Sequence, residues 1–457
     1  MTGETKTIGI KMPEQAEDIL KTLQDAGYEA YAVGGCVRDA ILGREPHDWD
    51  IATSARPGEV KKLFRRTIDT GLKHGTVTVM YGRNGYEVTT FRIDGVYEDG
   101  RHPEGVTFTP SLEEDLKRRD FTINAMAYDG RGGLIDLFGG KDDLERGIIR
   151  AVGDPVQRFS EDALRIMRAF RFSAQLGCGI EQSTLDAASM LAQKLKKVSA
   201  ERIRTELEKI LVSGSPGVIA DVFRAGITKV ILPEFDVCME TPQNTPYHCF
   251  TVGEHLIKSM ESVRDDRILR LTMLLHDIGK PACRTTDENG IDHFYYHADK
   301  SAETAEAVLR RLKYDNATTA RVVELVRWHD RQFRMTEPAV RKAVSQLGTE
   351  LFPLLLEVKR ADIAAQSGYQ REEKMEKVAR ISGMYDRIIR QGHCLCLGDL
   401  AVNGKDLIKC GFEPGREIGA ALDRMLADVI NTPWHNTKEY LLAHYAGNPH
   451  RGKSYSE

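Results

Sequence analysis

The sequence predicts an α/β segment at the N-terminus, with a mixed sheet and flanking helices, followed by a mostly all-α chain. Up to about residue 150, short β-branched and aromatic runs alternate with glycine-rich turns, which is typical of strands. From Asp154 onward such runs nearly vanish, and apolar residues recur with the 3.6-residue period of helices. A breaker-rich stretch at 232–250 then separates two helical parts.

The N-terminal elements follow one another in a regular order. We expect a helix near 13–26, a strand at AYAV (30–33), a glycine turn, a short helix at CVRDAILG and a second strand at DWDIAT. Further strands are expected at TVTVM (76–80), YEVTTFRI (86–93) and LIDLF (134–138). Later helices are expected at EDALRIMRAFRFSAQL and ERIRTELEKIL.

Length and composition set the broad class. At 457 residues the chain exceeds one hydrophobic core, so several domains are expected, with ranges 10–150, 151–240, 245–370 and 375–457. No apolar run is long enough to span a membrane and the N-terminus does not resemble a secretory signal, so we predict a cytoplasmic chain. The eight cysteines form no CxxC pair and are expected to be reduced.

The net charge and the local clusters of charge give different indications about a nucleic-acid partner. A formal net charge of −4 argues weakly against a nucleic-acid partner. Lys and Arg nevertheless gather at KKLFRR (61–66), KRR (117–119), the arginines of 165–171 and KLKK (194–197). A single run is usually a solvated helix face, but several within one half favour a polyanionic partner.

Two aspartates follow an adjacent glycine pair in VGGCVRDAILGREPHDWDIA, residues 33–52. On a strand, Asp48 and Asp50 would share one face, with Cα atoms about 6.6 Å apart, while Trp49 points the other way. Two such carboxylates can hold Mg²⁺ ions, and paired ions stabilise the attacking and leaving oxygens of an in-line displacement at phosphorus. We predict Glu87, on a neighbouring strand, as a third acid.

The glycine pair supplies the other half of this predicted site. Gly34 and Gly35 let the backbone approach a phosphate chain at the N-terminus of the helix that carries Arg38. Alone, an adjacent glycine pair is an ordinary turn. Together with the two aspartates, on strand, turn, helix and strand, it indicates a nucleotide-binding site.

These residues resemble the nucleotidyltransferase superfamily, and within it the bacterial class II tRNA nucleotidyltransferase and poly(A) polymerase family. The resemblance implies that Asp48 and Asp50 ligate catalytic magnesium ions and that Gly35 and Arg38 contact the triphosphate. It extends, in the family's order, to RRDFTINAMAYD (118–129), DLFGGKDDL (136–144), EDALRIMRAFRF (161–172) and ERIRTELEKIL (201–211).

The segment EDALRIMRAFRF also has a chemical interpretation. On a helix, Asp162, Arg165, Arg168 and Arg171 would be successive neighbours, as in any helix with Asp–Arg pairs. Cytosine and adenine present an amine donor beside a ring-nitrogen acceptor, and a carboxylate beside a guanidinium complements that pattern. Asp162 with Arg165 could therefore accept C and A and reject G and U without a nucleic-acid template.

The family resemblance agrees with this interpretation, because the matched motif selects CTP or ATP in the family. It assigns nucleotide contact to Asp162, Arg165, Arg168, Arg171 and Arg119. The polar segment 92–117 is similar to the family's flexible loop, which enzymes that add only the two cytidines lack, so that activity is disfavoured. Addition of only the terminal A stays open.

A second candidate site lies at LLHDIGKP (274–281), where imidazole and carboxylate stand side by side and suit a transition metal. Over about 245–370 the pattern resembles the HD superfamily of metal-dependent phosphohydrolases. That resemblance implies the ligands His255, His276, Asp277 and Asp362, with His297 and His329 in addition. Whether this domain is a phosphatase or phosphodiesterase stays open.

The patterns together with the family resemblance imply a CCA-adding tRNA nucleotidyltransferase that uses Mg²⁺, ATP, CTP and the 3′ end of tRNA. Its parts would be a nucleotidyltransferase head, a neck and body with the nucleotide-selecting helix, an HD domain and a tRNA-binding tail. A poly(A) polymerase would share the head motifs, although RGKSYSE is not the long basic tail expected of one. From another class, the HD domain could be a phosphohydrolase with the head as its RNA-binding module. A non-catalytic RNA-binding role is disfavoured, because it would not require these metal ligands.

Overall fold

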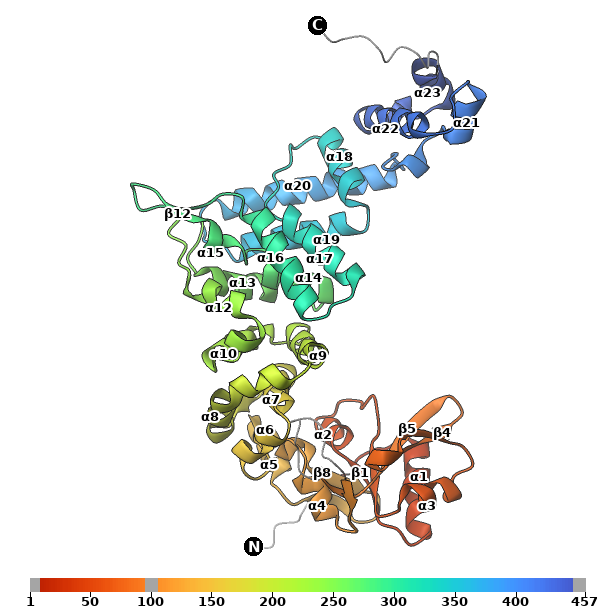
Figure 1. Ribbon diagram of the computed structural model, residues 1–457, viewed down its shortest axis with the longest axis vertical. Helices are drawn as coiled ribbons and strands as arrows, with labels where there is room; N and C mark the ends of the chain where they lie inside the picture. The colour runs from red at the N-terminus through yellow and green to blue at the C-terminus, as the bar shows by residue number, and fades with distance from the viewer. Residues whose placement is uncertain (1–8, 95–105, 447–457) are drawn as a thin grey trace. The chain divides into compact units, whose positions relative to one another are not determined.

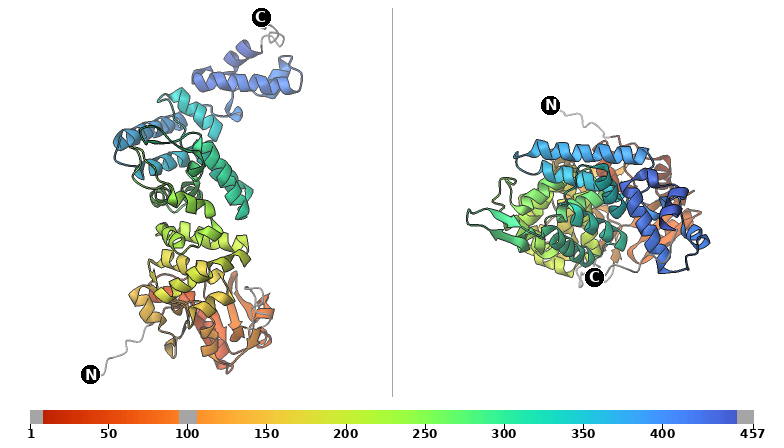
Figure 2. Two further views of the ribbon diagram at one scale, coloured as in Figure 1. Left: turned by 60° about the vertical axis from the view of Figure 1, so that its left-hand side comes forward. Right: turned by 90° about the horizontal axis from the view of Figure 1, so that it is seen from above.

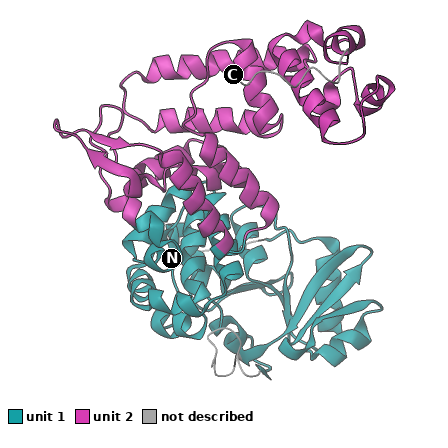
Figure 3. Cartoon of the chain, turned by 45° about the horizontal axis from the view of Figure 1, so that its top comes forward, with its two compact units in different colours: residues 1–236, 311–313 teal, residues 237–310, 314–457 magenta. Residues whose placement is uncertain are grey.

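The computed structural model describes residues 9–94 and 106–446 (Figure 1, Figure 2). The chain forms two compact units, which are described separately (Figure 3). Unit 1 contains residues Met1–Asp236 and Arg311–Lys313, and unit 2 contains Val237–Arg310 and Tyr314–Glu457. None of the helices in the described residues combines the length and the apolar character that crossing a membrane requires.

Seven strands form one mixed sheet in unit 1. β2 runs parallel to β5, and the other neighbouring pairs are antiparallel. In spatial order the strands are β3 (Thr67–Gly71), β4 (Thr76–Tyr81), β5 (Asn84–Thr90), β2 (Ile51–Thr53), β1 (Ala30–Val33), β8 (Met126–Asp129) and β9 (Gly133–Asp136). The predicted α/β fold with a mixed sheet is therefore confirmed.

Helices flank this sheet. α1 (Glu14–Asp25) packs against β1 and buries Ala16, Ile19, Leu20 and Leu23, whose spacing is that of one helix face. The other helices of this part are α2 (Gly35–Ile41), α3 (Pro57–Leu63), α4 (Leu112–Lys117) and α5 (Gly140–Arg146). Short pairs are formed by β6 (Arg92–Asp94) with β7 (Val106–Phe108) and by β10 (Ile148–Ile149) with β11 (Gly179–Ile180).

The rest of unit 1 is mostly helical, as predicted. α7 lies at its centre, where it packs against α9 and fully buries Ile166, Met167 and Phe170. The helices are α6 (Pro155–Glu161), α7 (Leu164–Leu176), α8 (Gln182–Leu191), α9 (Ala200–Leu211), α10 (Ile219–Arg224) and α11 (Thr228–Ile231).

The two aspartates precede the strand on which they were predicted. β2 begins only at Ile51, because its partner β1 ends at Val33, whose N–H donates to the Asp50 carbonyl at 3.0 Å. Before Asp50 no strand partner continues the ladder, since β1 passes directly into the turn at Gly34. The predicted alternation survives, because Trp49 is buried while both aspartates are exposed.

Asp162 does not share a helix with the three arginines, so that prediction was wrong. α6 ends at Glu161 and α7 begins at Leu164, with Asp162 between them in an extended conformation. The Asp162 carboxylate accepts a hydrogen bond from the Leu164 N–H at 3.0 Å. A local bond of this kind favours the start of a new helix over the continuation of the old one.

The predicted flexible loop, 92–117, contains regular structure where it is described. Residues 92–94 and 106–108 pair as β6 and β7, and 112–117 form α4, while the likeness of the segment to the family's flexible loop stays a prediction. The central part, 95–105, lies outside the described residues.

Unit 2 is helical apart from one hairpin, β12 (Arg284–Thr286) with β13 (Asp292–Phe294). The helices of this half of the chain are α12 (Pro233–Glu240), which crosses the division between the units, α13 (Val252–Glu261), α14 (Arg267–Leu275), α15 (Lys280–Cys283), α16 (His297–Arg311), α17 (Asn316–Trp328), α18 (Glu337–Leu347), α19 (Leu351–Ala364), α20 (Arg371–Arg390), α21 (Gly404–Lys409), α22 (Arg416–Asn431) and α23 (Lys438–Tyr445).

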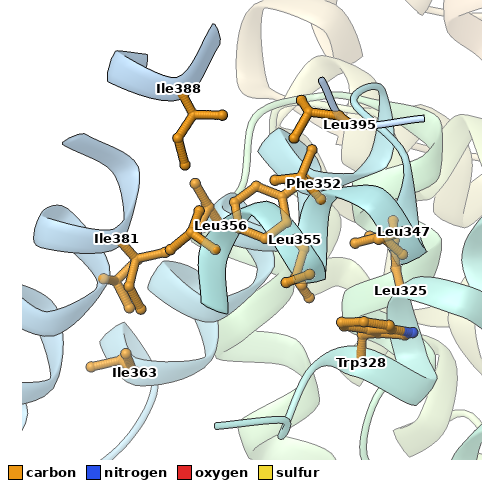
Figure 4. Packing of buried hydrophobic residues seen from close by; sticks show 14 residues of the cluster. Leu325, Trp328, Leu347, Phe352, Leu355, Leu356, Ile363, Ile381, Ile388 and Leu395 are labelled. Atoms are coloured by element: carbon orange, nitrogen blue, oxygen red, sulfur yellow. The ribbon is translucent and has the colours of Figure 1, made fainter. Parts of the chain in front are cut away.

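A core shared by α17, α18, α19 and α20 supports this half of the chain (Figure 4). Its side chains include Leu325, Val340, Phe352, Leu355 and Ile381. The long α20 lies alongside α19, as the right-hand view of Figure 2 shows. A second, smaller cluster that includes Leu407, Met425 and Leu441 holds α21, α22 and α23 together.

Truncation of Leu355 tests this core. Leu355 is fully buried, so we expect Leu355→Ala to destabilise the helical core by about 2–5 kcal/mol, through lost burial and the cavity that remains. Hydrogen exchange of α17 to α20 should measure this loss as faster exchange. Leu397→Ala, at a side chain 44% exposed, is the control. Equal protection in the two variants would contradict the assignment of this core.

Candidate functional site

The turn after β1 is built around a glycine that no other residue could replace without strain. Gly34 has φ 82° and ψ −128°, and a Cβ there would lie 2.8 Å from a terminal nitrogen of Arg119. Its N–H donates to the Met126 carbonyl on β8 at 3.1 Å. The backbone of this turn therefore passes directly beside the Arg119 guanidinium, and α2 starts at the next residue.

Three carboxylates gather beside this turn. β2 and β5 are parallel with Ile51 opposite Val88, so the residues one step earlier, Asp50 and Glu87, are brought to neighbouring positions. The pKa of Asp50 is raised, first because burial shields its carboxyl from water and then because Glu87 and Asp48 add negative charge, while Arg119 opposes the shift. The Asp50 side chain still reaches solvent. A divalent cation would relieve this repulsion, so the donor set fits the magnesium site predicted for Asp48 and Asp50.

Two arginines lie close to the glycine pair of this turn, Arg119 beside Gly34 and Arg38 beside Gly35. Arg38 is held by two hydrogen bonds to the Asp39 carboxylate, both at 2.9 Å, and by one to the Asn124 amide oxygen at 2.6 Å. Arg119 donates to Asp115 at 3.3 Å, and among residues 9–94 and 106–446 its buried Nε has no hydrogen-bond partner. Arg119 therefore keeps donor capacity that an anion at the glycine turn would satisfy.

Asp162 and Arg165 are held by different partners. Asp162 accepts from Arg202 at 2.8 Å. Arg165 donates to Glu161 at 2.7 Å and to the Arg118 carbonyl at 3.0 Å. The two side chains thus do not neutralise each other, which leaves the Asp162 carboxylate and the Arg165 guanidinium able to bond a third group.

Arg168 and Arg171 form ion pairs that tie α7 to its neighbours. Arg168 contacts Asp120 at 2.5 Å and Arg171 contacts Glu206 at 3.1 Å. Although burial acts to raise it, the pKa of Asp120 is lowered to about 2 by the Arg168 charge. Burial and the like charge of Arg168 lower the pKa of Arg171 to about 10. In this conformation both arginines are occupied in packing the helix.

Unit 2 brings all six residues of the second predicted site together. His255, His276, Asp277 and Asp362 form one group, and Asp277, His297 and His329 form another, with ligand atoms within 4.8 Å of one another in each. In the described residues, these are the groups that meet this spacing.

Asp277 joins the two groups through its two carboxylate oxygens. Oδ2 lies 3.5 Å from His255 Nε2 and 3.4 Å from His276 Nε2. Oδ1 is buried and lies 3.4 Å from His297 Nε2 and 3.3 Å from His329 Nε2. A carboxylate that presents one oxygen to each group is the arrangement that would bridge two metal ions.

The histidine rings are oriented for metal binding. Each Nδ1 faces a backbone carbonyl, at 3.4 Å for His255, 2.9 Å for His276, 2.7 Å for His297 and 2.6 Å for His329. When Nδ1 carries the proton, the lone pair of Nε2 points into the group. The Nε2 atoms also approach in pairs, at 3.2 Å for His255 with His276 and 3.3 Å for His297 with His329. Two lone pairs this close favour a cation between them.

Positive charge keeps the shared carboxylate ionised. Burial opposes ionisation of Asp277, but Lys280, whose Nζ lies 2.6 Å from Oδ2, and His276 hold its pKa well below the usual range. Burial likewise opposes ionisation of Asp362, and bonds to His255 and His276 lower its pKa well below the usual range. Both carboxylates are therefore ready to act as ligands at neutral pH.

A cavity of about 400 Å³ opens onto this cluster. Sequence analysis missed two of the residues that line it, Lys280 and His248. Lys280 was visible as the lysine of HDIGK, three residues after Asp277. His248 lies in the breaker-rich stretch before α13, where no periodic pattern indicates which way a side chain points.

Three family models match the chain. Residues 30–150 match "Poly A polymerase head domain", and residues 177–239 match "Probable RNA and SrmB-binding site of polymerase A". Residues 284–445 match a model described as tRNA nucleotidyltransferase domain 2.

Curated relatives and a solved structure extend the similarity over most of the chain. The CCA-adding enzyme of Lactobacillus helveticus is 36% identical over 439 residues, which cover 94% of this chain and 96% of the relative. That of Leuconostoc mesenteroides is 58% identical over 197 residues, 43% of this chain and 49% of the relative, so this match spans about half the relative's length. The crystal structure of the Bacillus stearothermophilus CCA-adding enzyme in complex with CTP is 32% identical, with a TM-score of 0.71, and covers 95% of this chain and 98% of that one.

The fold, the carboxylates beside the glycine turn and this near full-length similarity agree. The chain belongs to the CCA-adding enzyme family of nucleotidyltransferases.

Proposed function

We propose that this protein is a template-independent tRNA nucleotidyltransferase that adds CCA to tRNA 3′ ends from CTP and ATP. The observation that carries the proposal is the set of Asp48, Asp50 and Glu87 beside the Gly34 turn, in a chain similar over 94% of its length to a CCA-adding enzyme. Relatives solved with CTP, with ATP and with tRNA ending in CCA support the choice of substrates.

The residues divide the reaction between them. The 3′-hydroxyl of tRNA attacks the α-phosphate of CTP or ATP, and pyrophosphate departs. Asp48 and Asp50, with Glu87 beside them, would hold the metal ions, and Mg²⁺ bound there would supply charge stabilisation to the attacking and leaving oxygens. Gly35, Arg38 and Arg119 bind the triphosphate, since the turn presents backbone at the start of α2 and Arg119 has donors to spare.

Asp162 and Arg165 select the base. The Asp162 carboxylate accepts from the exocyclic amine of C or A, and the Arg165 guanidinium donates to the adjacent ring nitrogen. Their anchors, Arg202 for Asp162 and Glu161 for Arg165, hold the two side chains in place. Arg168 and Arg171 support this helix through Asp120 and Glu206.

The four ranges assigned from the sequence keep their roles in this proposal. Residues 10–150 are the catalytic head, 151–240 the neck and body, 245–370 the HD domain and 375–457 the tRNA-binding tail. Support comes from the matched polymerase head, 30–150, and from the separate hydrophobic cluster of α21 to α23. The reaction and its substrates assign the protein to the cytoplasm.

Removal of one head carboxylate should lower catalytic activity without lowering the stability of the fold. We expect Asp50→Asn to lower the rate of nucleotide addition at least about a thousandfold, because several kcal/mol of charge stabilisation are lost.

The same variant also tests stability. The pKa of Asp50 is higher in the folded state than in the unfolded state, so ionisation of Asp50 lowers the stability of the fold above the unfolded-state pKa. This cost disappears as the pH falls below the unfolded-state pKa. Without Mg²⁺ at pH 7, Asp50→Asn should therefore be at least as stable as wild type. Addition assays and thermal unfolding measure the two effects. Asp69→Asn, at an exposed aspartate on β3, is the control. Normal addition by Asp50→Asn would sink the mechanism.

Changing the proposed acceptor should change base selection. Asp162→Asn adds an amide donor where the carboxylate only accepts, so discrimination between CTP and UTP should fall at least about tenfold. The ratio of kcat/KM values for the two nucleotides measures it. Asp186→Asn makes the same change at an exposed position on α8 and should leave the ratio unchanged. An unchanged ratio in Asp162→Asn would show that base selection lies elsewhere.

A second activity is favoured by a separate observation, the two ligand groups that share Asp277. Four imidazoles and two carboxylates suit a pair of transition-metal ions, which in such a site activate water for attack on a phosphate ester. We therefore propose metal-dependent phosphodiester or phosphomonoester hydrolysis as an additional activity of the HD domain.

Removing one imidazole tests the second site. We expect His276→Ala, and His297→Ala at a less buried ligand, to reduce bound transition metal and to abolish hydrolysis of bis(p-nitrophenyl) phosphate. CCA addition should persist, because the head acids belong to unit 1. Metal analysis, the hydrolysis assay and the addition assay report on each part. His444→Ala, on α23, is the control. Full metal content in both ligand variants would refute the site.

A further inference from the structure

Exposed tyrosines surround the cavity at the second site. Tyr247, Tyr295 and Tyr296 line the cavity, and their exposed fractions are 39%, 66% and 85%. Tyr369, 49% exposed, packs edge-on against Tyr247 with ring centroids 5.2 Å apart. We call Tyr247, Tyr295 and Tyr296 the tyrosine rim. Large aromatic surface left in water at the edge of one cavity indicates a surface that binds something.

The backbone at Tyr296 strengthens this conclusion. Tyr296 lies in the turn between β13 and α16 with φ 61°, a conformation that favours glycine and is rare for a bulky residue. The next residue is His297, so the turn places a metal ligand inward. Glycine would make the same turn with less strain. A tyrosine with an exposed ring at this position is therefore explained better by contact with a ligand than by the fold.

The inner end of the cavity is lined by polar and charged groups, whereas the rim is aromatic. Lys280, buried, lies among the metal ligands, where its Nζ pairs with Asp277 at 2.6 Å. Within the described residues, the buried Nδ1 of His248 has no hydrogen-bond partner. Lys374 stands at the rim, with its Nζ 4.3 Å from the centre of the Tyr247 ring. A metal-ligand cluster with a buried lysine and an imidazole inside, and aromatic rings outside, matches a ligand with a phosphate at one end and a flat ring at the other.

We propose that the tyrosine rim stacks the base of a nucleoside phosphate and so makes the second site selective for nucleotide esters. This inference rests on the hydrolase activity proposed above. In the reaction, a water oxygen forms the new bond to phosphorus, the ester P–O bond breaks, and the leaving alcohol takes up a proton released by the water. The tyrosines touch only the base, so they determine specificity and not the chemical step.

The tyrosine rim is tested with substrates that all contain a phosphate ester but differ in whether they carry a nucleobase. Wild type, Tyr295→Ala, Tyr296→Gly and the double variant are assayed with adenosine monophosphate, a short RNA with a 3′-phosphate and glycerol phosphate. Tyr296→Gly removes the ring at a backbone position that glycine adopts readily, so it should fold at least as well as wild type. Tyr295→Phe and Tyr296→Phe keep the rings, and Ile389→Ala, 42% exposed on α20, is the control.

We expect the double variant to lose about tenfold in kcat/KM for nucleotide esters, mostly through KM, with glycerol phosphate unaffected and both Phe variants like wild type. Comparison of the free nucleotide with the RNA identifies the natural source of the base. Equal losses on all three substrates, or none, would overturn the rim as a base-stacking surface.

If the hydrolase proposal is wrong, the assays give a different result from the one expected if only the rim proposal is wrong. If wild type hydrolyses neither these three monoesters nor bis(p-nitrophenyl) phosphate, the proposed second activity falls, and Mn²⁺-dependent binding of adenosine monophosphate then tests the rim alone. The head contributes equally to binding in every variant, so the difference between wild type and the double variant reports on the cavity. A tenfold weaker affinity of the double variant supports stacking, and an unchanged affinity overturns it.

Discussion

Both candidate sites bring carboxylates close together, and the repulsion between these carboxylates is the constraint on which both sites depend. The two units offset this repulsion in different ways. Asp277 and Asp362 are surrounded by Lys280 and histidine rings, so their pKa values lie well below the usual range. Burial raises the pKa of Asp50, and the negative charges of Glu87 and Asp48 raise it further, while Arg119 offsets only part of the shift. The carboxylates of the second site are neutralised by groups of the protein, whereas cations that arrive with a triphosphate would neutralise those of the proposed head site.

This difference in how the carboxylates are neutralised fits the two proposed reactions, nucleotidyl transfer in the head and phosphate-ester hydrolysis at the second site. In the proposed hydrolase site, a metal held by buried imidazoles would remain in place between turnovers, because hydrogen bonds from Nδ1 to backbone carbonyls fix ligands such as His276 and His329. In the proposed head site, Mg²⁺ at exposed carboxylates would exchange with solvent and be shared with substrate phosphates. Under the proposed reaction the head would accept a new triphosphate for each nucleotide, so an open site would be an advantage there. The proposed base-selecting residues, Asp162 and Arg165, lie apart from these carboxylates in the sequence, at the break between α6 and α7.

The sequence predicted much of this because its signals are local. AYAV forms β1 as predicted, and the HD pair, the histidines before and after it, and Asp362 make up six predicted ligands that do come together. The helix break at Asp162 was missed because a side-chain bond to Leu164 N–H competes with helix continuation, which periodicity does not register. β3 was missed because it is a largely exposed edge strand without apolar alternation, and β8 because all four of its residues are buried. The direction of His248 depends on how the stretch before α13 folds, and no local pattern encodes that.

The central claim is that one protein, without a template, adds C, C and A in order. Transfer RNAs ending at the discriminator base, at C and at CC are incubated with CTP and ATP, separately and together, and their 3′ ends are sequenced. All three should end in CCA when both nucleotides are present, and with ATP alone only the tRNA ending in CC should gain a residue. Addition of A alone under every condition, or a run of many A residues, would contradict the account.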